Sequence, residues 1–243
     1  MAAEPAEEGP VAGTPRWRKR LNVAALYLVV ALGVTAPAWL GDGLLIGGGD
    51  QPDWTGTAWA YWWTGYAITH GMNPFDAAWN FFPAGQNPLS QYNLFDAILF
   101  WPLFAVLGPR LGYNVAALLT LWSSAAGAHV LARTIGGSRT TAIFAGIALE
   151  TSAFCMLELS HGRLSQALLV FWLLALSGLL RIMAGKGTWK LAVLTGLAAA
   201  ATHLTYWYYG LFLTLTAIPL WGAELWFWNG RRWRQLILAA AVT

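Results

Sequence analysis

The stretch RWRKRLNVAALYLVVALGVTAPAWLG, residues 16–41, decides the fold class of this chain. Basic residues fill its first part, and residues 21–41 carry no charge at all. That uncharged run is longer than the apolar region of an ordinary signal peptide, which favours an uncleaved transmembrane helix. Because basic residues beside such a helix favour the cytoplasmic side of a membrane, we expect the N-terminus to be cytoplasmic.

The N-terminal region leaves one alternative open. Ala36, Pro37 and Ala38 form a small-x-small site of the kind that signal peptidases cut. In either case the residues that follow are expected outside the cytoplasm. Residues 1–15 are rich in Ala, Glu, Pro and Gly, a composition typical of disorder. We therefore predict a disordered cytoplasmic tail, 1–20, and a transmembrane domain, 21–243, that is incomplete at its C-terminus.

The overall composition indicates a polytopic membrane protein. Of the 243 residues, 57% are hydrophobic and 10% are charged, and the mean hydropathy is +0.50. Soluble domains usually carry about 25% charged residues, so we predict an all-α bundle of transmembrane helices. The net charge of +3 does not indicate nucleic-acid binding, because most basic residues flank apolar runs. Cys155 is the single cysteine, which excludes an internal disulfide.

The basic residues also predict how the helices cross the membrane. Residues 94–109 contain Asp96 and Pro102, and a helix of that length reaches about 24 Å, short of the roughly 30 Å of a hydrocarbon core. We expect an interfacial or re-entrant helix there, on the outer side. The later spans then place all of the 14 basic residues except Arg110 and Arg163 in the cytoplasm. Those spans are expected at 111–132, 140–158, 165–181, 188–203 and 206–228.

Aromatic residues in the first outer loop recur at helical spacing. Trp59, Trp62, Trp63 and Tyr66 fall on one face of a helix. A helix of this kind beside a membrane lies at the level of the lipid headgroups. The simpler interpretation is an aromatic anchor. The functional interpretation is that Trp59 and Trp63 stack on the sugar rings of a substrate.

Acidic residues precede this juxtamembrane helix. Asp53 is placed to cap the N-terminus of the helix, and Gly71 its C-terminus. Asp50 follows three glycines, which let a backbone approach a ligand closely, and no local cap requires it. We therefore regard Asp50 as a candidate functional residue, with a merely solvated loop aspartate as the alternative, whereas the cap alone is a sufficient role for Asp53. His70 belongs to the same outer face.

A second outer cluster is the stretch ELSHGRLSQ, residues 158–166. It places Glu158, His161, Arg163 and Gln166 within one short turn. An arginine just outside a bilayer can hold a lipid phosphate in a bidentate fork, or it can simply reach the headgroups. No nucleotide-binding motif is present in the sequence, so a reaction driven by ATP or NAD is not indicated.

Further stretches of the sequence resemble one known family. These stretches are HGMNPF (70–75), FFPAGQN (81–87), YN (113–114), HVLARTIGGSR (129–139) and SHGRLSQ (160–166). Together with the basic N-terminus and the acidic first outer loop, they make residues 17–228 similar to the N-terminal half of GT-C-type membrane glycosyltransferases. The bacterial relatives of protein mannosyltransferases and aminoarabinose transferases belong to that group.

This resemblance implies an enzyme of the bacterial cytoplasmic membrane that takes a sugar from a polyprenyl-phosphate donor and transfers it on the extracytoplasmic side. In that family the first outer loop supplies an essential acid, which corresponds here to Asp50, with Asp53 second. These two acids lie three residues apart instead of forming the commoner adjacent or acid-x-acid pair, which weakens the case for a divalent metal ion between them. His70, His161 and Arg163 are the expected contacts of the lipid-linked sugar, and membrane lipids are the other expected partners.

Two other classes of protein compete with this prediction. Glu150 lies inside the third predicted span, where a charge costs roughly 2.5–3.5 kcal/mol. Such a group would suit a transporter or a lipid-handling protein without catalysis. A structural membrane subunit is the remaining alternative.

Overall fold

The computed structural model describes residues 16–40, 52–76, 93–226 and 230–242, and the predictions for Asp50 and for residues 81–87 fall outside these ranges. Within them the chain forms helices and no strands, which confirms the predicted all-α fold. The helices are α1 (Arg16–Val34), α2 (Ala36–Leu40), α3 (Pro52–Thr69), α4 (Leu94–Thr134), α5 (Arg139–Glu150), α6 (Ala153–Ser160), α7 (Leu164–Ala167), α8 (Val170–Arg181), a π-helical turn (Ile182–Lys186), α9 (Trp189–Thr205), α10 (Trp207–Trp226) and α11 (Gly230–Val242).

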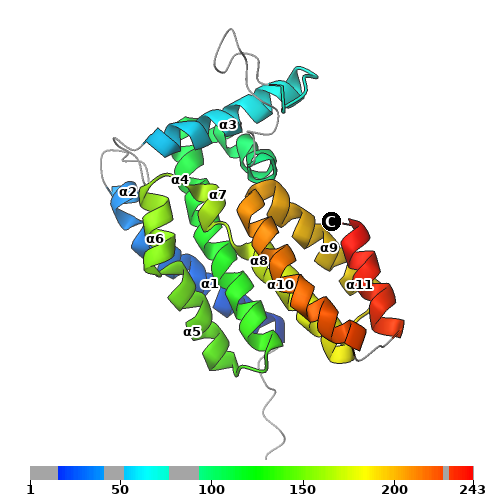
Figure 1. The fold of residues 1–243 in the computed structure, drawn as a ribbon. Coiled ribbons are helices and arrows are strands. Elements are labelled where there is room, and N and C mark those ends of the chain that lie inside the picture. Colours follow the sequence, from blue (N-terminus) through cyan, green and yellow to red (C-terminus); the bar gives the residue numbers. More distant parts are fainter. Residues whose placement is uncertain (1–15, 41–51, 77–92, 227–229, 243) are drawn as a thin grey trace, which may run out of the picture.

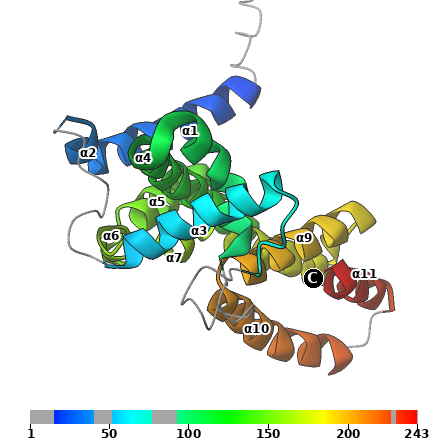
Figure 2. The ribbon, with the colours of Figure 1, turned by 90° about the horizontal axis from the view of Figure 1, so that it is seen from above.

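The helices form two groups, and α3 lies across one end of the first of them (Figure 1 and Figure 2). One group contains α1, α2 and α4–α7, and the other contains α8–α11. Each group has its own apolar core, one centred on α4 and the other between α8, α9, α10 and α11. Seen from above, α3 crosses over the bundle and α10 lies at the edge of the molecule (Figure 2).

Three helical segments of the described chain are long and apolar enough to cross a membrane, namely Leu94–Thr134, Arg139–Ser160 and Leu164–Lys186. Two shorter apolar helices lie at Leu21–Val34 and Trp233–Val242. The length and composition of these segments agree with membrane association. The other predicted spans and the orientation of the chain stay predictions.

The helix α4 is broken close to the boundary that the sequence predicted. Gly108 has a φ of +76°, outside the helical range, and separates a first part of α4 from a longer second part. The two parts pack tightly where Gly112 meets the backbone of the first part, because an added Cβ would lie 2.9 Å from the carbonyl carbon of Leu103. Residues 94–107 are therefore a separate short helix, as the interfacial interpretation requires.

A buried hydrogen bond fixes α3 to the beginning of α4. The Tyr61 hydroxyl donates to Oδ2 of Asp96 over 2.7 Å, and both residues are fully buried. The Tyr61 ring also packs edge-on against Phe104, with ring centroids 5.2 Å apart. Burial raises the pKa of the Tyr61 hydroxyl well above its ordinary value, so this group stays protonated and serves as the donor. The surface helix is thus anchored at a defined position on the bundle.

Removing this hydrogen bond should loosen α3. The change Tyr61→Phe keeps the ring but leaves Oδ2 of Asp96 without its donor, which should cost about 1–3 kcal/mol of stability. Thermal unfolding in detergent measures the effect, and Trp62→Phe, at a side chain that is half-exposed on the same helix, is the matched control. Equal unfolding temperatures for the two variants would contradict this role of Tyr61.

Candidate functional site

The turn between α6 and α7 is shaped by a glycine in the left-handed conformation. Gly162 has a φ of +77° and follows the end of α6. Its N–H donates to the Leu159 carbonyl over 3.0 Å, and the N–H of Arg163 donates to the Glu158 carbonyl over 2.8 Å. This pair of bonds is the Schellman motif, which ends a helix and reverses the chain. The motif places the Arg163 side chain close to that of Glu158.

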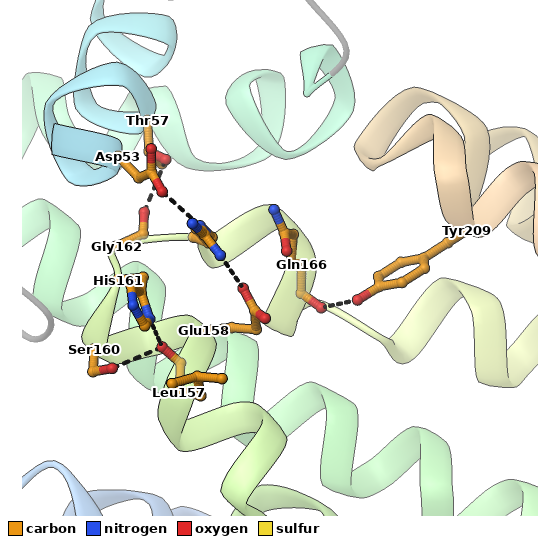
Figure 3. Close-up of polar contacts among 10 residues, drawn as sticks. Asp53, Thr57, Leu157, Glu158, Ser160, His161, Gly162, Gln166 and Tyr209 are labelled. Carbon is orange, nitrogen blue, oxygen red and sulfur yellow. Dashed lines mark hydrogen bonds and ion pairs between the residues drawn. The ribbon is translucent and has the colours of Figure 1, made fainter. Parts of the chain in front are cut away.

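The same turn receives the first turns of α3 (Figure 3). The Thr57 hydroxyl donates to the Gly162 carbonyl over 2.9 Å. Gly162 lies so close to α3 that an added Cβ would be 2.6 Å from the backbone nitrogen of Trp54. Glycine is therefore required here twice, by its backbone conformation and by the close approach of α3.

An arginine joins two carboxylates at this contact. Nε of Arg163 lies 2.6 Å from Oδ2 of Asp53, and Nη1 lies 3.7 Å from Oε2 of Glu158. The longer distance allows an ion pair but not a hydrogen bond, and Oε2 of Glu158 has no hydrogen-bond partner among the described residues. The Glu158 side chain is only 9% exposed, whereas that of Asp53 is 43% exposed. The cluster thus has a buried carboxylate behind the guanidinium and an accessible one in front of it.

The charges of this cluster limit what it can bind. The hydrogen bond with Asp53 is the main cause that raises the pKa of the Arg163 guanidinium, so this side chain stays positive. Two carboxylates against one guanidinium give an excess of negative charge. The predicted contact between Arg163 and a lipid phosphate stays a prediction.

The predicted caps of α3 have different outcomes. Asp53 lies in the first turn of α3 and not at its N-cap, so that prediction is wrong. Pro52 begins the helix, because its missing N–H and fixed φ suit the first helical position, and Asp53 is then free to reach Arg163. Gly71 is confirmed as the C-terminal stop, with a φ of +66°. The N–H of the next residue, Met72, donates to the Ala67 carbonyl over 2.8 Å.

The two predicted histidines lie at different places. His161 ends α6 beside the cluster, and its Nδ1 lies 2.8 Å from the Leu157 carbonyl. His70 follows α3, with its ring stacked on Tyr66 at a centroid distance of 4.0 Å. Along α3, His70 is about 25 Å from Asp53 at about 1.5 Å per residue. One small ligand therefore cannot contact both His70 and Asp53 in this arrangement.

The tryptophans of α3 pack largely against one another. Trp63 is fully buried, and its indole stacks on Trp59 with ring centroids 6.1 Å apart. Its Nε1 donates to the Pro74 carbonyl over 2.8 Å. Trp59 is partly buried, and Trp62 is half-exposed. The structure thus gives Trp63 a packing role, and the sugar-stacking role of Trp59 and Trp63 stays a prediction.

Two residues at this end of the bundle had no signal in the sequence. Thr57 bonds to the carbonyl of Gly162, and Tyr209 of α10 donates to the carbonyl of Gln166 over 2.9 Å (Figure 3). Backbone carbonyls far along the chain are their partners, and no local motif indicates such contacts. Through Tyr209, the α8–α11 group also contacts the short helix that follows Arg163.

The described residues do not form a metal site. No three His, Cys, Asp or Glu side chains in them come together as ligands. Asp53 is bonded to a guanidinium, and its predicted partner Asp50 lies outside the described ranges. A divalent cation is therefore not supported by the donor groups that this part of the chain provides.

Comparisons with known proteins find no matching protein-family model, no matching curated protein and no matching solved structure. The likeness to GT-C-type glycosyltransferases therefore stays a prediction from the sequence. The functional argument depends on the chemistry of the cluster itself.

Two glycines allow a matched test of the α3 contact. Gly162 and Gly136 both have positive φ, but an added Cβ meets Trp54 at Gly162 and nothing within 4 Å at Gly136. Gly136→Ala should cost only the left-handed strain, about 1–2 kcal/mol. Gly162→Ala should cost clearly more and should make α3 more sensitive to limited proteolysis. Equal losses of stability would show that α3 does not dock on this turn.

Proposed function

We propose that this chain is an integral membrane glycosyltransferase that moves a sugar from a polyprenyl-phosphate donor to an acceptor hydroxyl on the extracytoplasmic side. One observation carries the proposal, namely the charged cluster at one end of a largely apolar bundle. There Asp53, from the surface helix α3, lies 2.6 Å from Arg163. A buried Glu158 supports the guanidinium from behind. A guanidinium held between two carboxylates at the end of an otherwise apolar bundle is a candidate functional site.

Arg163 supplies the positive charge that the reaction needs. As the bond between the sugar and the lipid phosphate breaks, negative charge develops on the phosphate, and a guanidinium stabilises such charge. In the resting arrangement Arg163 is held by Asp53 and Glu158. Donor binding exchanges the contact with Asp53 for a contact with the phosphate.

That exchange also releases a carboxylate. An acceptor hydroxyl attacks the anomeric carbon only if a base takes its proton, and a carboxylate within hydrogen-bond reach serves this purpose. Asp53 is partly exposed and becomes free when Arg163 turns to the phosphate. Asp50 precedes it by three residues in the sequence and remains the first candidate for the base, with Asp53 second.

Substitutions in the loop and the turn test this function. Replacing the catalytic base by the isosteric Asn should lower kcat by about 10²–10⁴-fold. Comparing Asp50→Asn with Asp53→Asn therefore identifies which aspartate is the base. Arg163→Lys should mainly weaken donor binding, because lysine cannot form the bidentate fork. The assay measures sugar transfer from polyprenyl-phosphate donors in nanodiscs.

Asp76→Asn, at an exposed aspartate after α3, is the matched control and should retain full activity. Full activity of all the other variants would remove this cluster from the mechanism. A folded wild type that transfers sugar from no lipid-linked donor would contradict the proposed function itself.

A second candidate function is supported by Glu150. Its side chain is fully buried, and neither carboxylate oxygen has a hydrogen-bond partner among the described residues. Such a group is costly in a membrane bundle and is typical of a transport pathway. Transport should then be lost in Glu150→Gln, measured as movement of a labelled lipid across proteoliposomes. If both the wild type and the variant move no lipid, the transporter candidate fails.

A further inference from the structure

A cavity of about 200 Å³ lies among α8, α9, α10 and α11. Small residues make much of its wall, including Gly196 and Ala199 of α9, Ala217 of α10 and Ala239 of α11. Apolar cavities of comparable size bind apolar molecules. The proposed transfer reaction does not use this part of the molecule.

The cavity extends along two helices. Its wall runs from Thr195 to His203 on α9 and from Leu213 to Trp221 on α10, which is about 12 Å along each helix at about 1.5 Å per residue. Near one end, α9 and α11 are in close contact, because an added Cβ on Gly196 would meet the backbone of α11. This extent suits a linear chain.

Polar atoms gather at the other end. Nδ1 of His203 lies 2.9 Å from the Ala199 carbonyl, so Nδ1 carries a proton, and in the neutral imidazole Nε2 is then an acceptor. The Thr214 hydroxyl donates to the Gly210 carbonyl over 3.0 Å and lies 3.5 Å from Nε2 of His203. Both groups therefore accept a hydrogen bond from a ligand.

The position of the imidazole is fixed by a glycine. An added Cβ on Gly210 would lie 2.7 Å from Nε2 of His203, so only glycine leaves room for the ring. Thr214 is exposed, which means that this end of the cavity reaches the surface. A ligand can therefore keep its polar head at His203 while its apolar body lies between the helices.

We propose that this cavity binds one unbranched aliphatic alcohol, whose hydroxyl donates to Nε2 of His203 and whose chain lies along α9 and α10. A hydroxyl has one proton to donate to Nε2, whereas a carboxylate or an ester has none. The exposed leucines of α9, Leu194, Leu197 and Leu204, suit a lipid environment from which such a chain enters. The inference does not depend on the proposed transfer reaction.

Photolabelling tests the location of the ligand. A long-chain primary alcohol with a diazirine in its chain is added to the full chain in nanodiscs, and mass spectrometry maps the labelled peptides. Ala199→Phe fills the cavity and should reduce labelling of α9 and α10 by about tenfold or more. Leu197→Phe, on the exposed side of the same helix, is the matched control and should label like the wild type.

The head group is tested with the methyl ether of the same probe, which cannot donate. The wild type should bind the alcohol about tenfold more tightly than the ether. This ratio corresponds to one hydrogen bond of about 1.4 kcal/mol. The variant His203→Phe should bind the two probes equally. Equal labelling of Ala199→Phe and Leu197→Phe would overturn the site, and equal binding of alcohol and ether by the wild type would overturn the role of His203.

If Ala199→Phe does not fold, Ala217→Leu on the opposite wall takes its place. Neither measurement uses sugar transfer, so failure here is separate from failure of the proposed function.

Discussion

The end of the bundle that carries Asp53, Glu158 and Arg163 depends on the close approach of α3 to the backbone of Gly162. The left-handed glycine ends α6, and its carbonyl accepts the hydrogen bond from Thr57. Without a side chain at this position, the first turns of α3 come close enough for Asp53 to reach Arg163. The ion pair itself is partly exposed and contributes at most about 1 kcal/mol to stability. Its importance lies in where it holds two charged groups and not in how strongly it holds them.

Burying carboxyl groups lowers the stability of this apolar bundle. Three of them have different surroundings. Asp96 accepts a hydrogen bond from Tyr61 and helps to fix α3. Glu158 faces Arg163 at 3.7 Å, close enough for charge compensation but without a hydrogen bond. Glu150 has no hydrogen-bond partner among the described residues. An unpaired buried polar group is unfavourable for stability. Glu158 and Glu150 are two of the buried side chains with such atoms, and each functional candidate involves one of them.

Local signals in the sequence predicted the helices and their ends well, because periodicity and glycine stops act over a few residues. The aromatic repeat predicted α3, Gly71 predicted its end, and the break in α4 lies at Gly108, close to the expected boundary. Contacts between distant residues carried no such signal. Asp53 and Arg163 are 110 positions apart, so the sequence assigned one to a helix cap and the other to a phosphate, although they bind each other. Tertiary packing likewise decided the burial of Trp63.

We propose that the cluster of Asp53, Glu158 and Arg163 lies on the extracytoplasmic side of the membrane. The most direct measurement labels single cysteines at the two ends of the segment Arg139–Ser160, in a Cys155→Ser background, with a membrane-impermeant thiol reagent on intact cells. Both Thr140 and Ser160 are exposed, so Ser160→Cys should react from outside, and Thr140→Cys should react only after the cells are opened. Labelling of Thr140→Cys in intact cells, with Ser160→Cys protected, would place the cluster in the cytoplasm and contradict the account.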